Sequence, residues 1–148
     1  MMFEDLRDLY QEVILQHGRK PSHALRLEVF DADAKGDNPM CGDRVQVFVR
    51  HADNTVAEVG FEARGCAISI ASADLMAEAV IGKSDTAIAD LAERFVTMAR
   101  TGKTEDADLK TLHALAGVSE YPSRVKCATL PWMALKAALA GKGVASSE

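Results

Sequence analysis

The 148-residue sequence has few aromatic residues, few cysteines and no long hydrophobic runs. Aromatic side chains make up 5% of the chain, and 22 acidic residues outnumber 17 basic ones without a basic stripe, so nucleic acid is not an expected partner. No apolar run approaches the roughly 20 residues that a membrane helix needs, so no membrane association is expected. The acidic, amphipathic N-terminus is unlike a signal peptide, and we expect a cytoplasmic protein.

Cysteine is limited to positions 41, 66 and 127. Three thiols cannot pair off completely, and thiols stay reduced in the cytoplasm. This count therefore favours metal binding or catalysis over a disulfide framework. The length suits a single domain over residues 1–148 with one core, and we expect its tail, residues 141–148, to be disordered.

Hydrophobic periodicity predicts the order of helices and strands. An apolar face with helical spacing predicts a first helix over about residues 3–17. Alternating apolar and polar residues predict strands at 25–30, 44–50 and 58–64, with a loop over 31–38 and a hairpin turn over 51–55. Further helices are expected over 67–81, from Ser84 to Gly102, around Leu109, Leu112 and Leu115 up to Gly117, and from Pro122 to about Ala140. We expect Pro131 to kink or divide the last helix.

These elements predict an α+β fold in which a small three-stranded antiparallel sheet is packed on one face by about five helices. Cys41 precedes the second predicted strand and Cys66 follows the third. A hairpin brings those two strand ends together, so the two cysteines are expected to be neighbours in space. Cys66 is also expected at a helix N-terminus, where the helix dipole favours a thiolate.

The segment Asn38-Pro39-Met40-Cys41-Gly42-Asp43 places a thiol and a carboxylate two residues apart on a predicted loop. A tetrahedral zinc site takes four Cys, His or acidic ligands, and Cys41, Asp43, Cys66 and Cys127 supply four. Spacing alone leaves alternatives open. Each cysteine could be a small buried apolar residue, and Asp43 a turn carboxylate. The four histidines are expected at the surface or at helix ends, with His113 as a spare ligand.

The motif around Cys41, together with Gly65-Cys66-Ala67-Ile68-Ser69 and Val125-Lys126-Cys127, resembles the SufU/IscU family of iron–sulfur cluster assembly proteins, also called NifU-like N-terminal domains. The resemblance covers about residues 3–140 and implies a SufE/NifU-like fold. It implies that Cys41, Asp43, Cys66 and Cys127 bind zinc. Cys41 would be the thiolate that accepts persulfide sulfur.

The same resemblance implies partners: a SufS-type cysteine desulfurase, which would hold its own pyridoxal phosphate, and a downstream iron–sulfur assembly scaffold. Scaffold-type members carry a histidine immediately before the third cysteine, where this chain has Lys126. The segment between Cys66 and Cys127 is also longer here. Both features favour a zinc-dependent sulfurtransferase. The alternatives are a scaffold that builds an iron–sulfur cluster on the same ligands, since thiolates serve both metals, and a purely structural zinc site.

Overall fold

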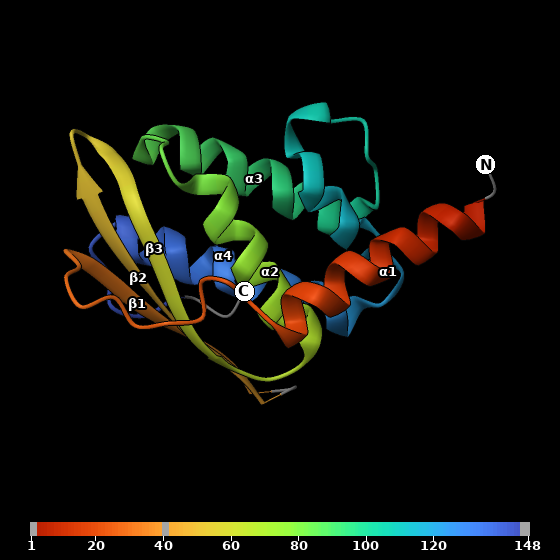
Figure 1. The fold of residues 1–148 in the computed structure, drawn as a ribbon, viewed down its shortest axis with the longest axis horizontal. Helices are drawn as coiled ribbons and strands as arrows, with labels where there is room; N and C mark the ends of the chain where they lie inside the picture. Colours follow the sequence, from red (N-terminus) through yellow and green to blue (C-terminus); the bar gives the residue numbers. More distant parts are fainter. Residues whose placement is uncertain (1–2, 40–41, 146–148) are drawn as a thin grey trace.

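The computed structural model describes residues 3–39 and 42–145, with side chains from residue 11 onward. It has the predicted α+β architecture, a three-stranded antiparallel sheet with helices on one face (Figure 1). In chain order the elements are α1 (Phe3–Arg19), β1 (Ala32–Asn38), β2 (Asp43–Ala52), β3 (Thr55–Arg64), α2 (Ala67–Val80), α3 (Asp85–Thr101), the 3-10 helix η1 (Ala107–Glu120) and α4 (Pro122–Leu139).

The β2–β3 hairpin confirms the predicted pairing of these strands. Its two turn residues, Asp53 and Asn54, have φ values of 53° and 67°, the conformation that a two-residue hairpin turn requires. Val47 lies opposite Phe61, and both side chains are buried beneath the helices. The register fixes which residues of β2 and β3 face the core.

The first strand lies where the sequence predicted a loop. The prediction of a strand over 25–30 is wrong, and β1 is instead Ala32–Asn38, paired antiparallel with β2. The residues of β1 that face the helices are small, because α4 crosses close by. A Cβ on Gly36 would lie 3.0 Å from Leu130 Cδ1. A strand whose buried positions are Ala34, Gly36 and Asn38 shows no hydrophobic alternation in sequence.

Residues 25–30 instead run across the second face of the sheet without regular structure. Leu27 is buried, and a Cβ on Gly60 would lie 3.2 Å from its side chain. The Phe30 ring meets the buried Phe48 ring edge to face, with centroids 5.0 Å apart. The alternating apolar residues of this segment therefore belong to a loop in which only some side chains pack on the sheet. Val29, for example, remains 71% exposed.

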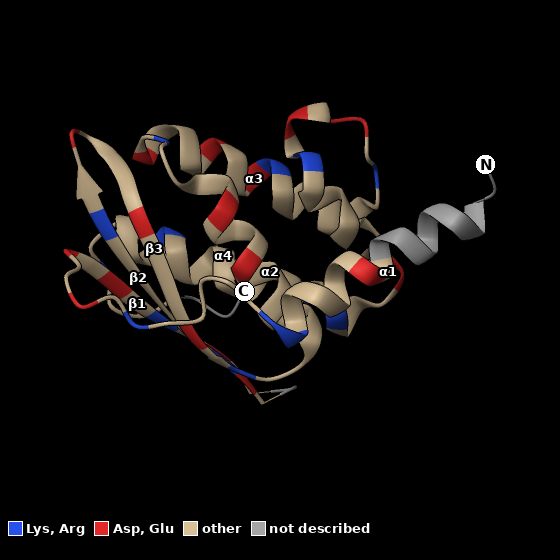
Figure 2. Cartoon of the chain, in the orientation of Figure 1, with Lys and Arg blue, Asp and Glu red and all other residues tan. Residues whose placement is uncertain are grey.

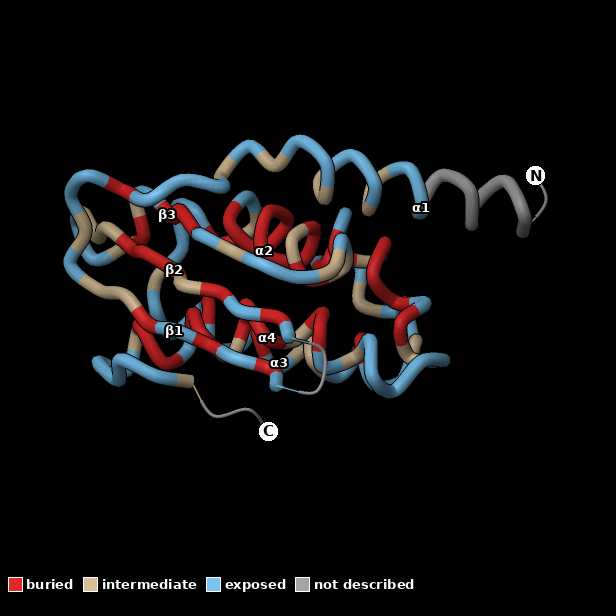
Figure 3. Tube along the Cα trace, turned by 90° about the horizontal axis from the view of Figure 1, so that it is seen from below, coloured by how far each residue is buried: buried red, intermediate tan, exposed pale blue. Residues whose placement is uncertain are grey.

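The helices form layers behind the sheet (Figures 1 and 3). Helices α2 and α4 pack directly on the strands, α3 and η1 pack behind α4, and α1 lies along α2. The buried stretches follow α2, α3 and α4, whereas α1 is exposed along much of its described length (Figure 3). Phe95 and Trp132 stack between α3 and α4 with ring centroids 4.7 Å apart. This helical layer supplies much of the apolar core.

Helix ends follow the sequence at some points and not at others. The Ser84 side chain accepts a hydrogen bond from Ala87 N, and Gly102 ends α3 in the left-handed conformation, as predicted. Gly117 does not end η1, which continues to Glu120. The helix stops before Tyr121, whose backbone is restricted because Pro122 follows it. Pro131 does not divide α4, which is one helix from Pro122 to Leu139.

The last described residues lie against β1. Lys35 donates its backbone N–H to Gly143 O and accepts from Ala145 N, at 2.9 Å and 2.8 Å. Residues 146–148 lie outside the described part of the chain, and disorder over 141–148 stays a prediction. Figure 2 shows acidic and basic residues interspersed over the fold. Within the described ranges, no helix combines the length and apolar character needed to span a membrane.

Candidate metal centre

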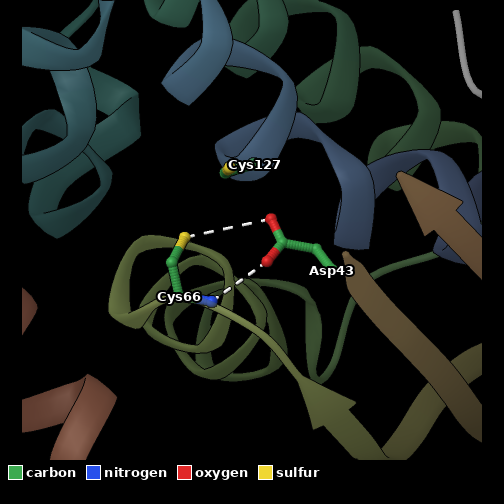
Figure 4. A group of neighbouring side chains, drawn as sticks. All are labelled: Asp43, Cys66 and Cys127. Carbon is green, nitrogen blue, oxygen red and sulfur yellow. Dashed lines mark hydrogen bonds between the residues drawn. The ribbon is translucent and has the colours of Figure 1, made fainter. Parts of the chain in front are cut away.

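Asp43 begins β2 and turns its carboxylate toward the helices, where the residue is fully buried. Its Oδ1 accepts a hydrogen bond from the backbone N–H of Cys66 at 3.0 Å (Figure 4). Its Oδ2 lies 3.9 Å from the Cys66 sulfur, which donates to it. A buried carboxylate requires such donors. The hairpin therefore joins the start of β2 to the end of β3 through these two side chains.

Gly65 makes this contact possible. It connects β3 to Cys66 with a φ of +147°, a value that side chains rarely permit. A Cβ at this position would lie 2.0 Å from Asp43 Oδ1. Only glycine allows the carboxylate to reach the backbone N–H of Cys66.

Cys66 is the N-cap residue of α2, as predicted, with extended backbone angles of −76° and 162°. It is half-buried, so its thiol lies at the rim of the core. The first-turn N–H groups of a helix and its dipole favour negative charge at this end. The position suits an anionic ligand atom.

Cys127 comes from α4, one turn and a half after Pro122, and is fully buried. Its sulfur lies 3.5 Å from the carbonyl oxygen of Ser123. The pKa of the Arg124 guanidinium is raised above its usual value, because its side chain hydrogen-bonds Cys127 and is attracted by the charges of Cys66 and Cys127. A cation therefore accompanies the two thiols.

The three side chains converge from β2, the start of α2 and α4 (Figure 4). One ligand atom each from Asp43, Cys66 and Cys127 lies within 4.8 Å of the other two. Tetrahedral zinc with Zn–S bonds of about 2.3 Å separates its sulfur ligands by about 3.8 Å. Two thiols and a carboxylate at this separation fit a zinc or iron ion with small side-chain movements. Cys41, the fourth predicted ligand, lies outside the described residues, and its role stays a prediction.

The other charged residues near the cysteines do not all face this cluster. Lys126 is exposed beside the buried Cys127. Arg44 is exposed and forms an ion pair with Asp37 at 3.4 Å, on the face of the sheet opposite to the helices. His113 contacts the carbonyl oxygen of Asp106 through Nε2 at 2.6 Å, which places its ring at the start of η1. The spare-ligand hypothesis for His113 therefore receives no support from its contacts.

Sequence reasoning missed a second polar cluster, between α1 and α2. His17 Nδ1 lies 2.5 Å from Asp74 Oδ2, and the backbone N–H of His23 donates to Asp74 Oδ1 at 2.9 Å. Asp74 is fully buried, and Glu78 lies close enough to join His17 and Asp74 around an ion. The sequence did contain a signal for this cluster: Asp74 is a charged residue within an alanine-rich helix whose apolar residues were predicted to be buried. The pair holds α1 against α2.

Comparison with known families and proteins places this cluster in context. A family described as the NifU-like N-terminal domain matches residues 9–140. The chain is 37% identical over 141 residues to the iron–sulfur cluster assembly scaffold protein IscU of Streptococcus pyogenes serotype M1, covering 94% of this chain and 87% of that protein. It is also 37% identical over 148 residues to the zinc-dependent sulfurtransferase SufU of Bacillus subtilis strain 168, covering 97% and 95%.

A solved structure shares the fold. It is the putative iron–sulfur cluster assembly scaffold protein for the SUF system from Fervidobacterium islandicum AW-1. The match has a TM-score of 0.81 at 31% identity and covers 90% of this chain and 98% of that one. The arrangement of sheet and helices is thus common to both chains.

Proposed function

Because this chain belongs to the NifU-like N-terminal domain family and has a role in iron–sulfur cluster assembly, we propose that it is a zinc-dependent sulfurtransferase that accepts persulfide sulfur from a SufS-type cysteine desulfurase. The observation that carries the proposal is the convergence of Asp43, Cys66 and Cys127, with ligand atoms within 4.8 Å. Two thiols with a carboxylate form a donor set that suits zinc. A downstream assembly scaffold would receive the sulfur.

Two features support sulfur transfer over cluster scaffolding. Lys126 stands where scaffold-type members carry a histidine, and it is exposed whereas Cys127 is buried. The long segment between Cys66 and Cys127 contains α3 and η1, whose buried side chains join the core. This region is therefore part of the fold and supports the helix that carries Cys127.

In the proposed centre, Asp43, Cys66 and Cys127 would hold the ion together with Cys41. Bound zinc would keep the ligand thiols deprotonated near neutral pH. Asp43 would also fix the backbone of Cys66, since its Oδ1 accepts from that N–H. Three thiolates and a carboxylate leave two negative charges in excess over a divalent ion, and the Arg124 guanidinium offsets part of that excess.

Cys41 is the proposed sulfur acceptor. Its thiolate would attack the terminal sulfur of the persulfide on the desulfurase. A new S–S bond then forms on Cys41, the S–S bond of the donor breaks, and the desulfurase cysteine leaves as a thiolate. The negative charge of the transferred sulfur stays on the new persulfide. The reaction needs no external oxidant or reductant.

Metal analysis of the protein purified anaerobically separates the two functions. Zinc near one atom per chain supports sulfur transfer. Iron together with acid-labile sulfide supports the alternative, a scaffold on which a cluster is assembled between the same ligands.

The acceptor role is tested by Cys41→Ser, with Met40→Leu as a control that alters the neighbouring side chain without removing a thiol. After incubation with the desulfurase and cysteine, we expect no gain of sulfur mass on Cys41→Ser and no stimulation of desulfurase turnover, because a hydroxyl is a far weaker nucleophile and cannot hold sulfane sulfur. Retained sulfur mass and stimulation in Cys41→Ser would assign the acceptor to another cysteine, with Cys127 first.

A further inference from the structure

The side-chain amide nitrogen of Asn38, buried on β1, has no hydrogen-bond partner in the described structure. Buried side-chain atoms without a partner there are Asn38 Nδ2, Ser69 Oγ and Trp132 Nε1. Trp132 lies in the apolar stack with Phe95, but Asn38 and Ser69 lie on segments next to the candidate metal centre. Leaving a buried donor unsatisfied destabilises the folded state, so its position calls for an acceptor.

The strand register places Asn38 beside the centre. Asn38 is the last residue of β1 and pairs directly with Asp43. Directly opposed residues of antiparallel strands project from the same face, with Cβ atoms about 4.5–5.5 Å apart. Both side chains are buried on the face covered by helices, Asn38 with 6% exposure and Asp43 with none. The Asn38 amide therefore lies one strand away from the carboxylate that contacts Cys66.

The candidate metal centre offers acceptors for the Asn38 amide nitrogen on this face of the sheet. Both Asp43 oxygens already face Cys66, one through its N–H and one through its sulfur. The backbone oxygen of Asn38 accepts from Gly42 N at 2.9 Å, and the side-chain nitrogen Nδ2 has no acceptor among the described residues. An ionised thiolate accepts hydrogen bonds, and a buried amide next to a cluster of thiolates meets that need.

Given the metal centre proposed above, on which this inference rests, we propose that Asn38 is a positioning residue whose side-chain amide donates a hydrogen bond to a thiolate ligand of the bound metal ion. Donors behind the ligands orient them and tune the metal, and their loss commonly costs 10–100-fold in metal affinity. Ser69 occupies a corresponding place on α2, one turn after Cys66 and one turn before Ser72, which donates to Ala128 O on α4. Under this proposal the centre would have a donor from β1, and Ser69 Oγ, also buried without a partner in the described chain, is available on α2.

The test uses cobalt(II) as a spectroscopic substitute for zinc in the full chain. Wild type should show thiolate-to-cobalt charge-transfer bands. In Asn38→Ala we expect those bands at lower energy, because a sulfur that loses a hydrogen bond holds its lone pairs less tightly. We also expect about 10–100-fold weaker zinc binding in competition with a chelator. Asn38→Asp keeps the side-chain size but removes the donors, and should lose at least as much affinity.

Gln46→Ala is the matched control. Gln46 is an amide on β2, three residues from Asp43 on the opposite face, where it donates to Asp33 at 2.9 Å. Its loss should leave the bands and the zinc affinity unchanged.

A second measurement separates positioning from a merely structural role. In excess chelator, Asn38→Ala should unfold at no lower urea concentration than wild type, since the amide nitrogen has no partner in the described chain. Unchanged bands and zinc affinity in Asn38→Ala would overturn the inference. So would lower stability in chelator with the bands unmoved. Absence of thiolate bands in wild type would instead overturn the proposed metal centre itself.

Discussion

At the scale of single residues, Gly65 governs the geometry of the candidate centre. We predict that Gly65→Ala weakens zinc binding, because the new Cβ would lie 2.0 Å from Asp43 Oδ1. The φ of +147° adds backbone strain, so the free energy of unfolding should fall by about 1–3 kcal/mol. Zinc competition and urea denaturation measure both effects.

The control for this prediction is Gly117→Ala. A Cβ at Gly117 meets no atom within 4 Å, so this substitution should leave zinc affinity intact and stability equal or slightly higher. Equal zinc affinity in Gly65→Ala and wild type would show that the Asp43–Cys66 contact is not needed for metal binding.

His51 carries a pH-dependent contact at the turn end of the β2–β3 hairpin, opposite to the end that holds Asp43 and Cys66. Its Nε2 lies 2.7 Å from Asp85 and its Nδ1 lies 2.6 Å from Asp31, so both ring nitrogens face carboxylates. The hydrogen bond to Asp85, followed by that to Asp31, raises the pKa of His51 despite partial burial. A pKa raised above the unfolded value of about 6.5 gives stability that is present below that pH and lost as pH rises through the folded pKa.

We therefore predict that His51→Gln lowers the free energy of unfolding more at about pH 6 than at about pH 9. The difference should stay below about 1 kcal/mol, because both carboxylates are about half exposed and screened by solvent. Urea denaturation across this range measures it. Asp53→Asn, an exposed acid in the same hairpin, serves as the control. A wild-type advantage that is constant with pH would contradict the prediction.

At the scale of elements, the contact between β1 and α4 connects the sheet to Cys127. Gly36 of β1 lies so close to α4 that an added Cβ would be 3.0 Å from Leu130 Cδ1 and 3.5 Å from Ala134 Cβ. We predict that Gly36→Val costs about 1–3 kcal/mol of stability through overpacking. It should also weaken zinc binding, because α4 must shift and Cys127 lies on it.

Lys35→Val is the control for this substitution. It introduces the same β-branched side chain at the preceding residue, which lies on the opposite, exposed face of β1. Melting temperature and zinc affinity should both stay near the wild-type values. Equal effects of the two substitutions would mean that strand propensity rather than the β1–α4 contact is responsible.

At the scale of the whole molecule, zinc and the apolar core should contribute separately to stability. The core includes the Phe95–Trp132 stack and the Val47–Phe61 pair, which need no metal to stay buried. A metal that binds only the folded state adds about 4 kcal/mol when its free concentration is 1,000 times Kd. We therefore predict that stripping zinc lowers the melting temperature without complete unfolding.

Circular dichroism during a thermal scan, with and without a strong chelator, measures this effect. The far-ultraviolet signal before melting should be largely retained in chelator. If metal analysis shows that the ion is gone and the melting curve is unchanged, zinc does not contribute to the stability of the fold. Complete loss of helical signal at low temperature would mean instead that the core depends on the metal.

Local sequence signals were sufficient to predict the parts of the fold that depend on neighbouring residues. The β2–β3 hairpin, the Ser84 cap and Cys66 at the start of α2 follow from alternation, turn residues and helix signals. The chemistry of the candidate centre was likewise visible, because carboxylate and thiol donors are recognisable by residue type and their order matches the family. The hairpin predicted that Cys41 and Cys66 are neighbours; Cys41 lies outside the described residues, and Asp43 at the start of β2 contacts Cys66.

Features that depend on packing between distant segments could be seen only in the folded chain. Packing placed β1 at Ala32–Asn38, because the close approach of α4 selects small residues and so removes the hydrophobic pattern that identifies a strand. It turned Arg124 toward the thiols and Arg44 away from them, and it buried Asp74 against His17. Each outcome depends on which surfaces pack together, and residue spacing along the chain does not encode that choice.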